Sequence, residues 1–206
     1  MQAQTGSDWI WLFNGENADA WRGYLKSELP SGWQIVDGAL TRVAEAGDII
    51  TKEKFDNFEL ELEWKIAPGG NSGIFFHVQE DSALEAVYLS GPEYQVLDNE
   101  AHRDGLDPRT SAGSNYALHA PAHDVTKQPG EWNSARVVVN GSHVEHWLNG
   151  AKLLEYELWS DDWNQRVAAS KFKDMPAYGK AKTGHIALQD HGDWVAYRSI
   201  RIRRSK

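Results

Sequence analysis

The chain has 206 residues, a formal net charge of −9 and no cysteine. A chain of this length suits one domain or two very small ones, and on folding it buries roughly 70% of its unfolded surface. The negative charge, without a block of clustered Lys and Arg, argues against a nucleic-acid partner, and the absence of cysteine excludes disulfides, thiolate metal sites and a cysteine nucleophile.

Residues 1–7 are small and polar, and they lack the basic and apolar segments of a signal peptide. No apolar run reaches the roughly 18 residues that a membrane span needs, so we expect no membrane insertion. We expect residues 1–7 to be a flexible leader and residues 8–206 to form a single domain. Such a leader fits a chain from which an export signal has been trimmed, which favours a periplasmic or secreted location and leaves a cytoplasmic one open.

The first elements of the chain are predicted to be short strands joined by tight turns. An apolar run at residues 9–13 ends in Asn14-Gly15, which marks a turn. Residues 33–36 and 39–43 are predicted to form a hairpin, because Asp37-Gly38 between them supplies the positive φ that a tight hairpin turn needs.

The next two strands differ in the character of their second face. Within residues 57–67 apolar and charged side chains alternate, so one face is core and the other faces water. In residues 71–78 the alternation separates two sets: Ile74, Phe76 and Val78 toward the core, and Asn71, Gly73, Phe75 and His77 away from it. Gly73 removes a side chain where a ligand or a neighbouring backbone could approach closely. His77 is then either a site residue or an ordinary surface residue of a strand.

Residues 91–99 place Glu93 and Gln95 on the same face of a predicted strand. An edge strand with its polar side in solvent explains this pattern equally well. Glu93 and Asp98 are five residues apart, so a straight strand puts them on opposite faces and about 17 Å apart. Paired-carboxylate glycosidases need about 5 to 10 Å, so any partner for Glu93 must come from another strand.

The second half of the chain is predicted to contain a long loop, further strands and one helix. Residues 100–111 form a charged loop that is long enough to cover a site. Turn signals and alternation then predict a strand at 112–119 with Tyr116 at its centre, strands at 132–139, 144–148 and 152–159, a short helix within 160–172, and a strand pair at 184–190 and 194–203. About a dozen short strands with one short helix predict an all-β fold, a jelly-roll β-sandwich of two antiparallel sheets.

No single motif fixes a reaction. The eight histidines show no helical metal-ligand spacing, although ligands could converge from neighbouring strands. The sequence has no Gly-x-Ser-x-Gly elbow and no glycine-rich phosphate loop. The pattern indicates a face of Asn, Gln, His and Glu in an aromatic-rich protein, which suits a polyhydroxylated ligand but does not define the chemistry.

Motifs along nearly the whole chain match, in order, those of one known family. They are Leu12-Phe13-Asn14-Gly15, Trp21, Trp33, Asp37-Gly38-Ala39-Leu40, Ile50-Thr51, Phe55-Asp56-Asn57-Phe58-Glu59-Leu60, Glu63-Trp64-Lys65, Asn71-Ser72-Gly73-Ile74-Phe75-Phe76, Gly91-Pro92-Glu93-Tyr94-Gln95-Val96-Leu97-Asp98, Glu131-Trp132-Asn133, His146-Trp147-Leu148-Asn149-Gly150 and the segment from Gly184 to Gly192. On these motifs the chain resembles the 3-keto-disaccharide hydrolase family, formerly a domain family of unknown function. The resemblance implies a sandwich of the concanavalin A-like lectin/glucanase type, related to laminin-G-like domains.

The resemblance also implies a reaction, the cleavage of glycosides that are already oxidised to a ketone at sugar C3. That ketone acidifies the C2 hydrogen, so a base can form an enolate that expels the C1 leaving group, after which water can add. Such a site needs one base, an acid for the leaving oxygen and a stabiliser for the enolate. A divalent cation is a reasonable stabiliser, and no organic cofactor is expected.

On this hypothesis the base is Glu93 or one of three histidines, His77, His146 and His191. The residues expected to bind the substrate are Asn71, Gln95, Tyr116 and Gln189. Asp98 and Asp190 are supporting carboxylates or metal ligands. Family members often carry Arg after Ile-Phe-Phe, where this chain has His77, so a permanent cation is replaced by a group that titrates near neutrality.

Two rival functions remain open at the level of sequence. The same sandwich can bind sugars without cleaving them, as a carbohydrate-binding module, and an isomerase-like enzyme could stop at the enolate. A carbohydrate is the expected partner in each case, and the sequence does not indicate an oligomeric state.

Overall fold

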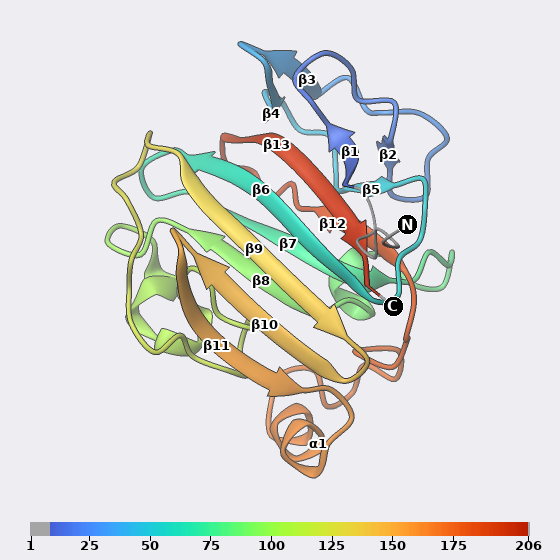
Figure 1. The fold of residues 1–206 in the computed structure, drawn as a ribbon, viewed down its shortest axis with the longest axis vertical. Helices are drawn as coiled ribbons and strands as arrows, with labels where there is room; N and C mark the ends of the chain where they lie inside the picture. The colour runs from blue at the N-terminus through green and yellow to red at the C-terminus, as the bar shows by residue number, and fades with distance from the viewer. Residues whose placement is uncertain (1–8, 206) are drawn as a thin grey trace, which may run out of the picture.

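The computed structural model describes residues 9–205, which form two antiparallel sheets packed face to face (Figure 1). The strands of the larger sheet are β1 (Ile10–Phe13), β3 (Trp33–Val36), β4 (Ala39–Arg42), β6 (Phe58–Ile66), β9 (Asn133–Asn140), β10 (His143–Leu148), β11 (Ala151–Glu157) and β13 (Val195–Arg204). The strands of the smaller sheet are β2 (Trp21–Gly23), β5 (Ile49–Thr51), β7 (Asn71–Val78), β8 (Glu93–Leu97) and β12 (His185–Leu188). The helical segments are α1 (Asp161–Ala168) and three 3₁₀ turns, η1 (Val87–Leu89), η2 (Arg103–Leu106) and η3 (Pro108–Thr110).

The larger sheet has eight strands in the order β11-β10-β9-β6-β13-β4-β3, with β1 also paired to β13. The smaller sheet has five, in the order β2-β5-β12-β7-β8. The core lies between them, where Phe58 of β6 packs edge-on against Phe76 of β7 with ring centroids 6.2 Å apart. Burying an apolar side chain of this size contributes about 1.5–3 kcal/mol. The predicted all-β sandwich is confirmed.

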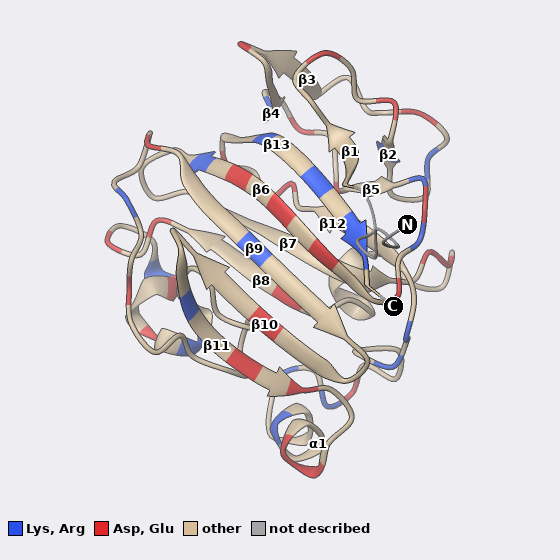
Figure 2. Ribbon diagram, in the orientation of Figure 1, with Lys and Arg blue, Asp and Glu red and all other residues tan. Residues whose placement is uncertain are grey.

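The outer face of β6 and β13 is charged and partly exposed, as the alternation of β6 predicts. Glu59, Glu61 and Glu63 of β6 stand opposite Arg203, Arg201 and Arg198 of β13. Figure 2 shows the acidic positions of β6 beside the basic positions of β13. Arg198 Nε lies 2.8 Å from Glu63 Oε2, and directly opposed charges of opposite sign stabilise a strand pair.

Loops cover the outer face of the smaller sheet, the face that points away from the larger sheet. Strand β8 is the edge of that sheet, yet all of its residues are buried. Residues 113–116 run along this edge, where Gly113 N donates to Gln95 O (2.8 Å) and Tyr116 N donates to Glu93 O (3.1 Å). The polar side chains of β8 are therefore enclosed rather than solvated.

The alternation predicted for β7 is wrong at its end. His77 has a φ of +53°, and the register between β7 and β12 shifts near this residue, so the strand contains a bulge. As a result, Val78 joins Phe75 on the outer face of the smaller sheet. His77 instead packs edge-on against Phe58 and Phe76 on the core side.

Two other predicted elements differ from the structure. Residues 112–119 form turns with isolated bridges at Asn115, to Tyr94 and to His119, instead of a strand. The predicted helix is present as α1, and it is capped by Ser160, whose Oγ accepts a hydrogen bond from Trp163 N (3.1 Å). It ends at Ala168, before the last residues of the predicted range.

The expected leader at residues 1–7 lies outside the described residues. The division into a leader and one domain at 8–206 therefore stays a prediction, as does the periplasmic or secreted location. None of the helices within residues 9–205 is long and apolar enough to cross a membrane.

Candidate active site

A cleft of about 160 Å³ opens on the outer face of the smaller sheet. Strands β7 and β8 form its floor, the turn after β12 forms one wall, and η1, residues 113–116 and the segment after α1 surround it. Its lining residues are Asn71, Tyr88, Glu93, Gln95, Tyr116, Lys171, Gln189 and His191. A larger depression of about 680 Å³ lies around residues 26–32 and 45–47, and none of the predicted site residues lines it.

Glu93 is the buried carboxylate of the cleft, with only 6% of its surface exposed. None of the described residues donates a hydrogen bond to that carboxylate. Its place depends on Gly73 of the neighbouring strand, because a Cβ at Gly73 would overlap with Glu93 Oε1. Desolvation raises the pKa of Glu93 well above its ordinary value; the positive charge of Lys171 opposes this shift, and Asp48 and Asp104 reinforce it.

Three amide side chains around Glu93 have acceptor oxygens without a partner among residues 9–205. Gln95 Nε2 donates to Thr110 O (3.1 Å), which fixes the amide and leaves its buried Oε1 unpaired. Asn71 Oδ1 and Gln189 Oε1 are likewise buried and unpaired. A buried polar atom without a partner costs about 1–3 kcal/mol, so these amides are suited to ligand hydroxyl groups that would restore the missing hydrogen bonds.

Lys171 lies at the mouth of the cleft, on the segment that follows α1. Lys171 is exposed. Its Nζ lies 4.1 Å from the centroid of the Tyr116 ring, which is within cation–π distance. Tyr116 OH donates in turn to Asp104 Oδ2 (3.0 Å). Desolvation lowers the pKa of Lys171, and the charges of Glu93 and Asp104 oppose that shift. The cleft therefore holds a buried carboxylate and a cation near each other.

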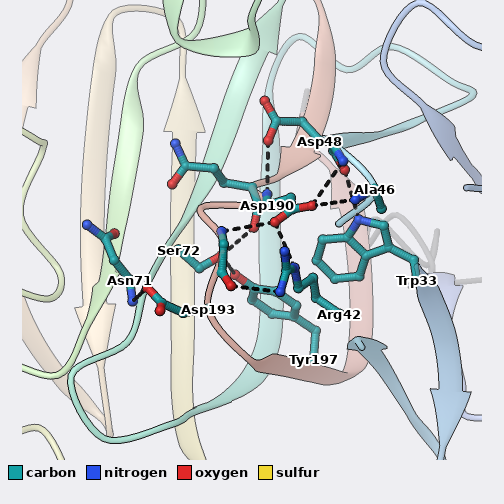
Figure 3. Close-up of polar contacts among 12 residues, drawn as sticks. Trp33, Arg42, Ala46, Asp48, Asn71, Ser72, Asp190, Asp193 and Tyr197 are labelled. Carbon is teal, nitrogen blue, oxygen red and sulfur yellow. Dashed lines mark hydrogen bonds and ion pairs between the residues drawn. The ribbon is translucent and has the colours of Figure 1, made fainter. Parts of the chain in front are cut away.

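Asp190 ties together the loops behind the cleft (Figure 3). Its carboxylate accepts hydrogen bonds from Ala46 N (2.7 Å), Gly47 N (3.0 Å) and Arg42 Nε (2.8 Å). Although burial raises the pKa of Asp190, these donors hold it below its ordinary value. Asp190 N donates to Asp48 Oδ1 (2.9 Å), and burial raises the pKa of Asp48 to about 6.

A second set of contacts fixes the backbone of two of the cleft amide residues, Asn71 and Gln189. Ser72 Oγ donates to Gln189 O (2.7 Å) and lies 2.7 Å from Tyr197 OH. Asn71 N donates to Asp193 Oδ2 (3.0 Å) (Figure 3). The backbones of Asn71 and Gln189 are thus fixed while their side chains face the cleft.

Two of the histidines predicted as bases are not in the cleft. His77 Nε2 donates to Asp56 O (2.8 Å), and burial lowers its pKa. His146 is fully buried, where its Nδ1 donates to Gly113 O (3.0 Å) and its Nε2 accepts from Tyr156 OH (3.3 Å). Desolvation lowers the pKa of His146 to about 4. Both histidines are packing residues, and neither can reach a ligand in the cleft, whereas His191 lines it.

A family model for 3-keto-alpha-glucoside-1,2-lyase-like domains matches residues 8–203. This chain belongs to that family. A 3-keto-disaccharide hydrolase of Bacteroides thetaiotaomicron is 38% identical over 225 aligned positions, which cover 95% of this chain and 78% of that protein. The predicted family and the predicted enzyme class, a hydrolase, are confirmed.

Solved structures show the same fold as this 3-keto-alpha-glucoside-1,2-lyase-like domain. A protein of Parabacteroides distasonis, proposed to be a glycosyl hydrolase, superposes with a TM-score of 0.90 at 35% identity and covers 96% of this chain and 94% of its own. A second protein of that organism with the same proposed activity gives 0.78 at 28% identity, over 96% and 100% of the two chains. An endo-β-1,3(4)-glucanase reaches 0.54 at 10% identity over 100% and 94%, which shows the sandwich fold alone.

The side chains of this domain do not favour a divalent cation in the cleft. Both carboxylate oxygens of Asp98 accept backbone hydrogen bonds, Oδ2 from Gly69 N (2.7 Å) and Oδ1 from Glu100 N (3.1 Å), and those of Asp190 are engaged as described above. Within residues 9–205 the group of metal-binding side chains that converges is His143, Glu145 and Glu155, on β10 and β11 of the other sheet. Inside the cleft the oxygen donors are the Glu93 carboxylate and three amide oxygens, and the positive charge of Lys171 opposes a bound cation there. A catalytic metal stays a prediction.

Sequence reasoning missed three residues of this region, Lys171, Tyr88 and Asp48. Lys171 has the four-residue spacing from Val167 that suggested a continuing helix, which hid its place beyond the end of α1. Tyr88 comes from η1, and Asp48 precedes β5. No local pattern marks any of the three, because tertiary packing brings Lys171 and Tyr88 to the cleft and Asp48 to Asp190 behind it.

Proposed function

We propose that this chain cleaves glycosides whose sugar carries a ketone at C3, with Glu93 as the base that removes the C2 proton. The proposal is supported by family membership and by one observation, the enclosed and unpaired carboxylate of Glu93 among amide groups. A desolvated carboxylate binds a proton more tightly, and a base of raised pKa is better suited to remove a proton from carbon.

The steps follow from the ketone. Glu93 takes the C2 proton, and the electron pair of the C2–H bond forms an enolate with the C3 ketone. The enolate then collapses, C3=O is restored, C1=C2 forms, and the C1–O1 bond breaks with its electron pair on the leaving oxygen. Water can then add across C1=C2, with its oxygen at C1 and a proton at C2, to give the free 3-keto sugar. The relative from Bacteroides thetaiotaomicron is named for a net hydrolysis of this kind.

The amides give the sugar its orientation. Gln95, Asn71 and Gln189 each present an unpaired oxygen that can accept a hydrogen bond from a sugar hydroxyl. The ring of Tyr116 and the exposed ring of Tyr88 supply apolar surface for the sugar's C–H groups. A polyhydroxylated ring of one sugar unit suits a cleft of this size and lining.

The test is the variant Glu93→Gln, assayed with a 3-keto-α-glucoside by release of the leaving group. We expect turnover to fall by about 10²–10⁴-fold, because the amide keeps the shape of the side chain and cannot take the proton. Glu85→Gln is the matched control, since Glu85 is exposed and lies outside the cleft. Unchanged turnover in Glu93→Gln would remove Glu93 from the mechanism, and binding without product release by the wild-type chain would favour a carbohydrate-binding module.

A further inference from the structure

The cleft has two titratable groups of opposite charge at different depths. Glu93 is buried at the floor, on β8, and Lys171 is exposed at the mouth, held over the ring of Tyr116. A sugar ring bound between floor and mouth would present one face to each group. The elimination requires both a base for C2–H and an acid for the leaving oxygen, so the second role is open.

Other cleft residues are less suited to be the acid. The hydroxyl hydrogen of Tyr116 is already donated to Asp104, and desolvation together with that carboxylate raises the pKa of Tyr116. His191 is exposed at the rim, 6.3 Å from the ring of His102 between centroids. Among the described cations, Lys171 is the one whose charge acts on Glu93. Its ammonium group has three hydrogens and makes no ion pair with a carboxylate in residues 9–205.

We propose, on the basis of the function proposed above, that Lys171 donates a proton to the leaving O1 oxygen while Glu93 takes the C2 proton from the opposite face of the sugar. In the elimination Glu93 gains one proton, Lys171 loses one, and the C1–O1 electron pair leaves with the newly formed hydroxyl group. In the hydration the neutral Lys171 amine takes a proton from water as its oxygen bonds to C1, and Glu93 returns a proton to C2. Both residues regain their starting states.

The same geometry selects a stereochemistry. Removal of the C2 proton from one face and protonation of O1 on the other require the C2–H and C1–O1 bonds to be antiparallel. In a glucoside chair C2–H is axial, and O1 is axial on the opposite face only in the α anomer. In a β-glucoside O1 is equatorial, so Glu93 and Lys171 cannot act on antiparallel C2–H and C1–O1 bonds. Lys171 therefore accounts for a preference for α-glycosides.

The test compares leaving groups that differ in their need for an acid. The substrates are the methyl and the p-nitrophenyl 3-keto-α-glucosides, because methoxide needs protonation to depart and p-nitrophenolate does not. In Lys171→Met we expect turnover of the methyl glycoside to fall by about 10²–10⁴-fold and turnover of the p-nitrophenyl glycoside to stay within about tenfold of wild type. Lys171→Arg should behave like Lys171→Met, since arginine keeps the charge and does not give up a proton. Lys173→Met is the control, as Lys173 is exposed two residues away and outside the cleft.

Three results would overturn the assignment. Equal losses on both substrates, no loss on either, or full activity of Lys171→Arg would each show that Lys171 is not the proton donor while leaving the proposed function in place. A wild-type chain that converts neither glycoside would overturn the proposed function and this assignment with it. Because Lys171 is exposed, a change in the thermal unfolding midpoint is not expected, and that measurement separates a catalytic loss from misfolding.

Discussion

Two strands of this molecule carry polar side chains at two-residue spacing, glutamates along β6 and Glu93 followed by Gln95 on β8, and their glutamates lie in opposite surroundings. On β6 Glu61 and Glu63 are half-buried and Glu59 is buried, and each of the three faces an arginine of β13. On β8 Glu93 is enclosed, faces Gly73 and has no hydrogen-bond partner among the described residues. The sequence patterns are similar, so the difference comes from what covers each sheet. A carboxylate that is paired with arginine stabilises a sheet face, whereas one that is buried and unpaired is available for chemistry.

Among the variants that test this comparison, Gly73→Ala is expected to change turnover and stability most. The added methyl group would overlap with Glu93 Oε1 and with the edge of the buried Phe75 ring, so the carboxylate must move. A displacement of about 1 Å at a reacting group can lower turnover about 10²-fold, and overpacking costs about 1–3 kcal/mol of stability. Turnover of a 3-keto-α-glucoside and urea unfolding would measure the two effects.

Ser72→Ala is the control for that variant, because Ser72 lies in the same strand and its substitution leaves the space beside Glu93 unchanged. Gly38→Ala is unsuitable, since Gly38 has a positive φ. Ser72→Ala removes the hydroxyl that holds Gln189 O, so a smaller loss is expected from it. A Gly73→Ala variant with wild-type turnover would show that the position of the Glu93 carboxylate does not matter for the reaction.

The contrast between Gly73 and His77 shows where sequence reasoning succeeds and where it stops. The alternation of β7 and β8 correctly placed Asn71, Glu93 and Gln95 on one face, because period-two patterning and antiparallel pairing are local properties. It failed at His77, since a non-glycine residue with positive φ leaves no mark in the sequence and the bulge reverses the faces. Lys171 is 78 positions from Glu93, and only tertiary packing brings it to the cleft.

A second way to sharpen the comparison is the stability of Glu93→Gln as a function of pH. The folded pKa of Glu93 is raised above its unfolded value of about 4.3, so the carboxyl contributes most stability when it is protonated and loses it as pH rises through the folded pKa. Glutamine does not titrate, and the variant should become more stable than wild type as pH increases. Each unit of raised pKa corresponds to about 1.4 kcal/mol, so we expect a gain of more than about 1 kcal/mol at pH 8 and almost none at pH 4.

Urea unfolding of wild type and Glu93→Gln at both pH values measures that gain. A difference in unfolding free energy that is the same at pH 4 and pH 8 would contradict a buried, destabilising carboxylate. Together with loss of turnover, a gain at high pH would mean that this chain gives up stability to keep a charged base in its cleft.

The smallest effect is expected from Glu63→Gln on the outer face of β6 and β13. The side chains of Glu63 and Arg198 are 31% and 39% exposed, and exposed ion pairs contribute about 0.2–1 kcal/mol. Arg198 also lies over the ring of Trp132, 4.1 Å from its centroid, so the guanidinium keeps a partner when the carboxylate is lost. The loss of stability should therefore fall at the low end of that range and shrink further in 1 M salt, while turnover stays at the wild-type level. A tenfold change in turnover would assign a functional role to the outer face of β6 and β13. The contrast with β8 would then fail, because charge pairing would no longer separate the structural glutamates from the proposed catalytic one.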